Sequence, residues 1–306
     1  MNSVLVVGSV ALDSVETPFG RIEDALGGSA TFFSAAASHL TKVKLVGVVG
    51  NDYPVDQLEP LKARGVDLAG LMHADGESFR WRGRYRHDLN SAETLETRLG
   101  VFSQFRPQIP DQFHKSPFIF LDNIDPRLQH DVLDQVEKPT LVAADTMNFW
   151  IESRRNELLK LLERVDILLL NDAEARQLTE EFNLIRAARW IMARGPKQVV
   201  IKKGEHGAYM FSESSVFFAP AYPLEEVFDP TGAGDSFAGG FVGYLARTGR
   251  NDEAAMRRAV VYGSTLGSFA VEKFSIDRLM EVHRVDIARR LEEFRRLVTF
   301  EKELDE

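Results

Sequence analysis

The segment Asp229–Gly240, Asp-Pro-Thr-Gly-Ala-Gly-Asp-Ser-Phe-Ala-Gly-Gly, contains the residue types and spacing best suited to chemistry in this chain. A Gly-Ala-Gly turn that enters a helix leaves backbone N–H groups without partners, and the positive end of the helix dipole lies behind them. Such a turn binds anions. Asp235 follows it, and a carboxylate here makes sense if it accepts a proton from a hydroxyl while the N–H groups stabilise a transferring phosphoryl group. The alternative is an N-capped helix whose glycines only permit close packing.

Three further groups stand where ligands could bind. Asp13 follows the first apolar run and either hydrogen-bonds the hydroxyls of a sugar or caps a turn. A Gly-Gly-Ser segment at 27–29 precedes a helix of small residues, and its glycines allow a ligand to approach the backbone. Asn171 and Glu174 follow the apolar run Val-Asp-Ile-Leu-Leu-Leu, and oxygen ligands at this spacing suit Mg²⁺ or its waters. The alternative for this pair is a plain helix cap with a capping-box glutamate.

The segment 202–207, Lys-Lys-Gly-Glu-His-Gly, predicts either a phosphate-neutralising turn or an exposed hairpin.

Other signatures of catalysis are missing from the sequence. The histidines show no HExxH spacing, which argues against a catalytic zinc ion. Neither GxxxxGK[ST] nor a GxGxxG after the first strand occurs, so a P-loop enzyme and a dinucleotide-binding enzyme are both disfavoured.

Composition limits the partners and the compartment. The net charge of −9 argues against nucleic acid as the main partner. No run approaches the roughly 18 apolar residues that cross a bilayer, so we expect no membrane partner. The count of 0 cysteines excludes disulfides and thiolate chemistry, and it fits a cytoplasmic protein.

Alternating strands and helices must position these residues. Short aliphatic runs predict buried strands at 3–10, 43–49, 117–121, 140–144, 165–170 and 198–202. Helical patterns lie near 29–40, 55–64, 127–137, 153–163, 172–194, 235–247, 251–271 and 276–296. This order predicts an α/β fold, with a mainly parallel sheet sandwiched by helices and ligands at the carboxyl ends of its strands.

One segment follows a different period. Residues 79–86 alternate strictly, so Phe79, Trp81 and Tyr85 share one face of a strand and the arginines share the other. The arginines of that face are Arg80, Arg82, Arg84 and Arg86. We expect this strand to pair with 96–102 in a small antiparallel sheet outside the main one. The arginine face could meet an anionic ligand, a second subunit or only solvent, so a homodimer through this sheet is one of the alternatives.

The motifs together resemble those of the ribokinase family, also called the phosphofructokinase-B family of carbohydrate and nucleoside kinases. The segment 229–240 resembles the family's C-terminal signature. Along the chain, Val-Gly-Val-Val-Gly-Asn-Asp at 46–52, Asn-Asp-Ala-Glu at 171–174 and Lys-Lys-Gly-Glu-His-Gly-Ala at 202–208 resemble further family motifs in the same order. The resemblance covers nearly the whole chain. It implies a single kinase domain over 1–306, with a small β-sheet lid formed mainly by about 12–26 and 77–104.

The resemblance also implies a role for each matching position. For catalysis these are Asp235 as general base and the N–H groups of Gly232, Ala233 and Gly234 as the anion hole. For the acceptor they are Asp13, Gly27, Gly28, Ser29 and Phe32. For ATP they are Asn171, Glu174, Lys203, Gly204 and Ser264, the first two also organising Mg²⁺ through water. Asp229 and Thr231 match positions near a monovalent-cation site, for which K⁺ is the candidate.

Departures from the family pattern bear on the acceptor. Phe32 stands where members often carry an asparagine that contacts the sugar, and Lys202 stands where a threonine is frequent. The Gly-Gly-Ser segment is more similar to adenosine kinases than to ribokinases. These features favour an ATP-dependent kinase acting on a nucleoside over one acting on a sugar or sugar acid, for which inward-facing lid arginines would be suggestive. A catalytically silent, ligand-binding regulator is a third hypothesis, and the retained Asp235 argues against it.

Overall fold

A nine-stranded sheet forms the centre of the molecule, and it is mainly parallel, as predicted. The structure is a computed structural model, and it describes residues 2–299. The strands lie in the order β13-β12-β11-β10-β9-β8-β1-β4-β5, and only the β11–β12 and β12–β13 pairs are antiparallel. Their bounds are β1 Ser3–Val7, β4 Lys42–Val49, β5 Val66–His73, β8 Phe118–Leu121, β9 Leu141–Asp145, β10 Ile167–Asn171, β11 Gln198–Lys202, β12 Ala208–Ser212 and β13 Val216–Ala219.

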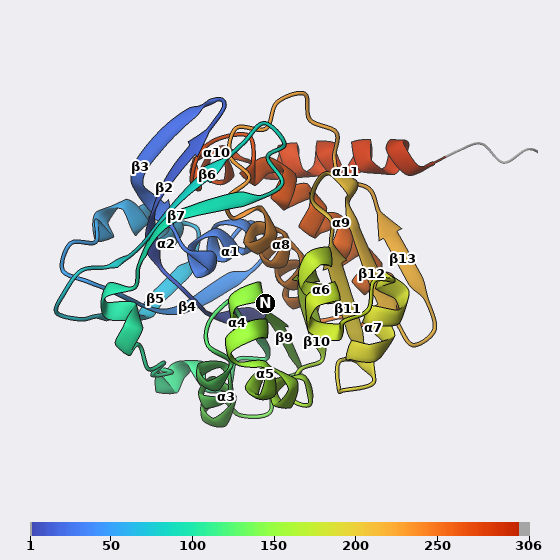
Figure 1. Ribbon diagram of the computed structural model, residues 1–306, viewed down its shortest axis with the longest axis horizontal. Helices are drawn as coiled ribbons and strands as arrows, with labels where there is room; N and C mark the ends of the chain where they lie inside the picture. Colours follow the sequence, from blue (N-terminus) through green and yellow to red (C-terminus); the bar gives the residue numbers. More distant parts are fainter. Residues whose placement is uncertain (1, 300–306) are drawn as a thin grey trace, which may run out of the picture.

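Helices cover both faces of this sheet (Figure 1). One face packs against α1 Ser29–Ala37, α2 Glu59–Ala63, α8 Ala233–Thr248, α9 Glu253–Ala270, α10 Asp277–Glu281 and α11 Arg284–Val298. The other packs against α3 Pro126–Gln135, α4 Asn148–Ser153, α5 Arg155–Leu162, α6 Asp172–Thr179 and α7 Leu184–Met192. In β10, Ile167 and Leu169 pack on the first face, whereas Leu168 and Leu170 pack on the second. Both faces of the strand are buried, which explains its unbroken apolar sequence.

A second, four-stranded sheet stands apart from the first, above the carboxyl ends of the main strands (Figure 1). Its order is β3-β2-β6-β7, with bounds β2 Ala11–Thr17, β3 Gly20–Gly27, β6 Phe79–Tyr85 and β7 Ala92–Arg98. The partner of β6 is therefore 92–98, whereas 96–102 was expected. Residues 100–104 form a short 3₁₀ helix, η2 Gly100–Gln104, which ends the strand pairing.

Several predicted helices are divided by local backbone geometry. The pattern at 172–194 forms two helices because Glu180 takes a left-handed conformation with φ of 60° and Asn183 caps the next helix through its side chain. The pattern at 276–296 is also divided, into α10 and α11, with Val282 extended between them. The pattern at 153–163 forms α5, and the separate helix α4 ends at Ser153. Amphipathic periodicity continues across such breaks because both helices pack on the same sheet.

No helix within residues 2–299 combines the length and apolar character that crossing a membrane requires.

Candidate active site

The glycine turn before α8 is built tightly against the core. Gly232 is the N-cap of α8 and has a φ of 70°, and a Cβ added there would lie 2.2 Å from the Phe32 ring. Only glycine fits this position, since the backbone is left-handed and the ring of Phe32 is packed beneath it. Phe32 is 2% exposed, so its ring supports the turn at the floor of the cleft and offers little surface to a stacked ligand.

The turn leaves fewer free donors than expected. The N–H of Ala233 donates to the carbonyl of Pro230 at 3.2 Å. Within the described residues, the N–H groups of Gly232 and Gly234 have no backbone acceptor. Two of the three expected anion-hole donors are therefore available, at the positive end of a 16-residue helix.

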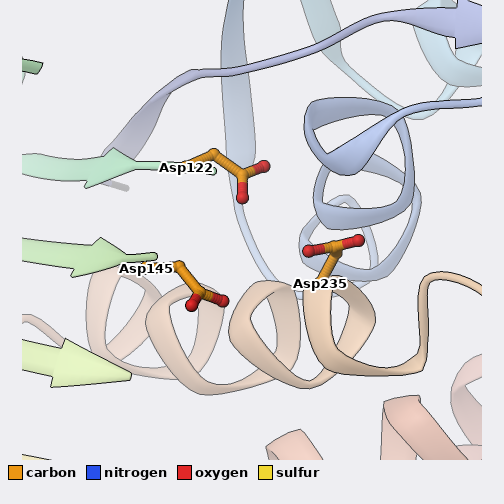
Figure 2. A group of neighbouring side chains, drawn as sticks. All are labelled: Asp122, Asp145 and Asp235. Carbon is orange, nitrogen blue, oxygen red and sulfur yellow. The ribbon is translucent and has the colours of Figure 1, made fainter. Parts of the chain in front are cut away.

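Asp235 lies at the centre of a cluster of carboxylates. Figure 2 shows Asp122 and Asp145 leaving the ends of neighbouring strands and Asp235 rising from the first turn of a helix, with all three side chains facing one another. One carboxylate oxygen from each lies within 4.8 Å of the others. Burial raises the pKa of Asp235 to about 6, with Lys202 opposing and Asp145 adding to the increase. A carboxyl group with this pKa can accept a proton near neutral pH.

Asp122 is the most deeply buried member of the cluster. Its side chain is 0% exposed, and its Oδ2 atom has no hydrogen-bond partner in the described part of the chain. Burial and the charges of Asp235 and Asp145 raise the pKa of Asp122 well above its usual range. Three carboxylates this close need a proton or a cation between them, and oxygen donors are the ligands that Mg²⁺ prefers. The oxygen donors that line the cleft, Asp235 and Glu174 among them, therefore fit a magnesium ion.

Asp145 is paired with a mostly buried lysine. The Nζ atom of Lys202 lies 2.9 Å from Asp145 Oδ2, and only 16% of the lysine side chain is exposed. Lys202 ends β11 and is in register with Asn171, which ends β10, so both side chains reach the same edge of the sheet. Parallel strands bring these residues together from sites far apart in the sequence.

Asn171 and Glu174 form a reciprocal cap on α6. Asn171 Oδ1 accepts from the N–H of Glu174 at 2.8 Å, and Glu174 Oε2 accepts from the N–H of Asn171 at 2.7 Å. The helix-cap alternative is therefore present, and both residues also line the cleft. Burial raises the pKa of Glu174 to about 7, and the negative charge of Asp145 adds to this increase. Glu174 Oε1 remains available to a metal-bound water.

The other half of the cleft begins at Asp13. Its Oδ2 atom accepts from the N–H of Gly28 at 3.2 Å, and burial raises its pKa to about 7. A Cβ at Gly27 would lie 2.1 Å from Asp13 Oδ2, and one at Gly28, where φ is 87°, would lie 2.6 Å from Ser9 O. The glycine pair is therefore required to bring α1 against the first strands and to seat the Asp13 carboxylate. Ser29 Oγ lies 3.1 Å from Ser9 Oγ at the same wall.

The two faces of β6 have separate environments. Phe79, Trp81 and Tyr85 line the cleft, whose volume is about 1510 Å³. None of the four arginines is among the cleft-lining residues. The arginine face pairs with acids of the same chain: Arg80 with Asp24 at 3.2 Å, Arg84 with Glu16 at 3.1 Å and Arg86 with Glu93 at 3.3 Å. Inward-facing arginines, which would suggest a sugar acid as the acceptor, are not found on the described strands of this sheet.

Further aromatic side chains line the cleft, beside β6 and on α4. Phe102 and Phe105 lie near β6, with ring centroids of Phe79 and Phe102 at 5.2 Å. Trp150, on α4, donates from Nε1 to Asn123 Oδ1 at 3.0 Å. An apolar, aromatic wall facing a few polar groups is typical of a site for a small organic ligand.

The remaining predicted residues divide between the cleft and its surroundings. Thr231, Lys203 and Gly204 line the cleft. Asp229 is 1% exposed and accepts from the N–H of Thr231 at 2.9 Å, so it lies beneath the turn. Ser264 lies within α9 and is not among the cleft-lining residues.

Sequence reasoning missed Asp122 and Asp145. Asp122 directly follows the apolar strand β8, in Phe-Ile-Phe-Leu-Asp, and Asp145 is the last residue of β9, in Leu-Val-Ala-Ala-Asp. The rule that selected Asp13 and Asn171, a polar residue at the end of a buried strand, would have selected these two as well.

Comparison with known proteins identifies the family of this chain. The model of the pfkB family carbohydrate kinases matches residues 1–281. The chain belongs to the pfkB family. Over 264 residues it is 31% identical to the cytidine kinase of Thermococcus kodakarensis, covering 84% of this chain and 93% of that relative. The predicted family is therefore confirmed, and the chain is a kinase of the carbohydrate and nucleoside type.

Solved structures of this kinase family share the fold. The nucleoside kinase of Burkholderia thailandensis, in complex with inosine, is 20% identical with a TM-score of 0.76, over 95% of this chain and 96% of that one. The E. coli protein designated Ribokinase II, in complex with ATP and Mg²⁺, is 20% identical with a TM-score of 0.76, over 97% of this chain and 100% of that one. ATP and Mg²⁺ are thus consistent with this kinase.

Proposed function

We propose that this pfkB-family kinase transfers the γ-phosphoryl group of ATP to a hydroxyl group of a nucleoside. The observation that carries this proposal is Asp235, a carboxylate beside free N–H groups at a helix N-terminus, facing a cleft with an aromatic wall. The similarity to a cytidine kinase supports a nucleoside, and a pyrimidine nucleoside in particular. The outward position of the arginines removes the feature that would favour a sugar acid.

In this proposal, Asp235 accepts the proton of the attacking hydroxyl group. The N–H groups of Gly232 and Gly234 donate to the oxygens of the phosphoryl group as its charge shifts. Asp13, held by the Gly28 N–H, accepts hydrogen bonds from the ribose hydroxyls. Trp81 and Tyr85 contact the base from the second sheet, which acts as a lid that excludes water.

The phosphates of ATP then lie along the ends of β10 and β11. Asn171 and Glu174 would hold Mg²⁺ through water, since two of their oxygen atoms are used in the cap of α6. When bound, Mg²⁺ neutralises phosphate charge. Lys203 and Gly204 contact the nucleotide, and Ser264 would act only through α9, because it lies outside the cleft lining. Asp229 and Thr231 are proposed as the K⁺ site. A cytoplasmic location and a homodimer formed through the lid are two further proposals.

The rate of transfer is expected to rise with pH through about 6. Asp235 must be ionised to accept a proton, and its pKa is raised from 3.8 to about 6. Below that value kcat should therefore fall about tenfold per pH unit. A profile of kcat against pH at saturating ATP and Mg²⁺ measures this fall. The residual rate of Asp235→Asn, which has no carboxyl group at this position, should not fall with pH in the same way. A midpoint near 4 would contradict a buried base.

A panel of acceptors tests the function itself. ADP release should be measured with Mg-ATP and cytidine, uridine, adenosine, inosine, ribose, fructose and a sugar acid. We expect kcat/KM for at least one nucleoside to exceed that for every free sugar by about 100-fold or more, because only nucleosides bury a base. A free sugar as the best acceptor would favour the sugar-kinase alternative. Turnover of none of them would leave the non-catalytic regulator.

A further inference from the structure

We propose that Lys202 is a catalytic residue whose ammonium group contacts the transferring γ-phosphoryl group. The inference rests on the proposed function, and it assigns to this lysine a role that the family resemblance does not supply. Threonine is frequent at this position in the family, and this chain carries a lysine there.

The position of Lys202 is the first argument. Its Nζ atom lies 3.1 Å from the point that a Cβ on Gly234 would occupy. The ammonium group is therefore in contact with the first turn of α8, beside the N–H groups proposed to hold the phosphoryl oxygens. It also faces the cleft.

The balance of charge is the second argument. Lys202 interacts electrostatically with Asp145, Glu174 and Asp235, three carboxylates around one ammonium group. A triphosphate that entered this space would meet net negative charge, so a cation at the turn is needed. The other lysine and arginine side chains of the cleft have partners of their own. Arg127 lies 3.5 Å from Glu157, Arg106 donates to the carbonyl of Phe105 at 2.8 Å, and Lys203 lies 5.7 Å from the Tyr209 ring.

Burial is the third argument. A buried, desolvated cation acts more strongly on a nearby charge than an exposed one. The ion pair with Asp145 orients Lys202 before ATP binds. The Nζ atom carries three N–H groups, and the bond to Asp145 uses one of them. The two remaining N–H groups can donate to phosphoryl oxygens.

The step balances without a further reactant. The acceptor oxygen forms a bond to the γ-phosphorus and loses its proton to Asp235. The bond from that phosphorus to the bridging oxygen breaks, and its electron pair stays on ADP. Lys202 keeps its proton throughout and stabilises the charge on the phosphoryl oxygens.

The main test is Lys202→Met, which keeps an unbranched side chain of similar length and removes the charge. We expect kcat to fall about 10³-fold, as when a phosphoryl-stabilising cation is removed. Titration calorimetry should show at least about tenfold weaker binding of AMP-PNP, which carries a γ-phosphoryl group, with ADP binding within about threefold of wild type. Equal losses for AMP-PNP and ADP, or a kcat within tenfold of wild type, would overturn the proposal.

A second variant separates catalysis from structure. Lys202→Met leaves Asp145 without its ion pair, so Lys202→Met/Asp145→Asn removes both charges. If the double variant has wild-type thermal stability but kcat stays low and AMP-PNP still binds more weakly relative to ADP, the proposal is supported. Recovery of kcat and of AMP-PNP binding in the double variant refutes it. Lys197→Met is the matched control. Lys197 directly precedes β11, at the end of the strand away from the cleft, and its Nζ atom lies 2.8 Å from Asp166 Oδ1. Breaking this ion pair should leave kcat unchanged.

The outcomes also separate this inference from the proposed function. AMP-PNP and ADP binding need no acceptor. If the wild-type protein binds neither, the proposed function fails. If it binds both and Lys202→Met binds them as wild type does, only the role of Lys202 fails.

Discussion

Replacing Asp235 with asparagine is expected to lower kcat by about 10³-fold or more. The amide has nearly the shape of the carboxylate but cannot accept the hydroxyl proton. The N–H groups of Gly232 and Gly234 are unchanged, so ATP should still bind. Removing a buried carboxyl group from the cluster of three should not reduce thermal stability, because burial already disfavours its charged form.

Asp122→Asn is the matched control for this substitution. Asp122 belongs to the same cluster, yet it lies beneath the surface of the cleft and does not line it. We expect its kcat to stay within about tenfold of wild type, since an acid that does not touch the acceptor contributes only through its field. Steady-state kcat, the Kd of ATP and the Tm should be measured for both variants. An Asp235→Asn enzyme that is folded and retains wild-type turnover would falsify the general-base role.

Replacing Trp81 with alanine is expected to raise the KM of the nucleoside by about 10- to 100-fold, with the KM of ATP unchanged. The indole lies over Gly83, where a Cβ would come within 2.0 Å of the ring, and Nε1 donates to Thr94 Oγ1 at 3.3 Å. The ring is therefore held on the strand before a ligand binds. A ring held in place loses little entropy when a base stacks on it.

Arg82→Ala is the matched control for Trp81→Ala. Arg82 is the next residue of β6 and points to the opposite, exposed face. Its removal should change neither KM. Free ribose, if it is turned over, should be insensitive to Trp81→Ala because it has no base. A nucleoside KM that is the same in wild type and Trp81→Ala would place the base elsewhere in the cleft.

The sequence by itself determined the family, the main sheet and the reaction class. These follow from local patterns: buried strands are continuous apolar runs, helices repeat every 3.6 residues, and the turn before Asp235 needs glycine at a left-handed position. The helix break at Glu180 and the strands β5, β12 and β13 were not predicted. Their boundaries depend on single backbone angles and on pairing with distant strands.

Only the tertiary structure decided which side chains meet Asp235. Asp122, Asp145 and Lys202 lie at the ends of three different strands, and nothing in their local sequence tells how the strands are ordered. The parallel arrangement brings their ends to one edge, where burial and mutual charge raise the pKa of Asp235 to about 6. Likewise, alternation in 79–86 predicted two faces for β6, but the packing of the second sheet decided that the aromatic face, and not the arginine face, lines the cleft.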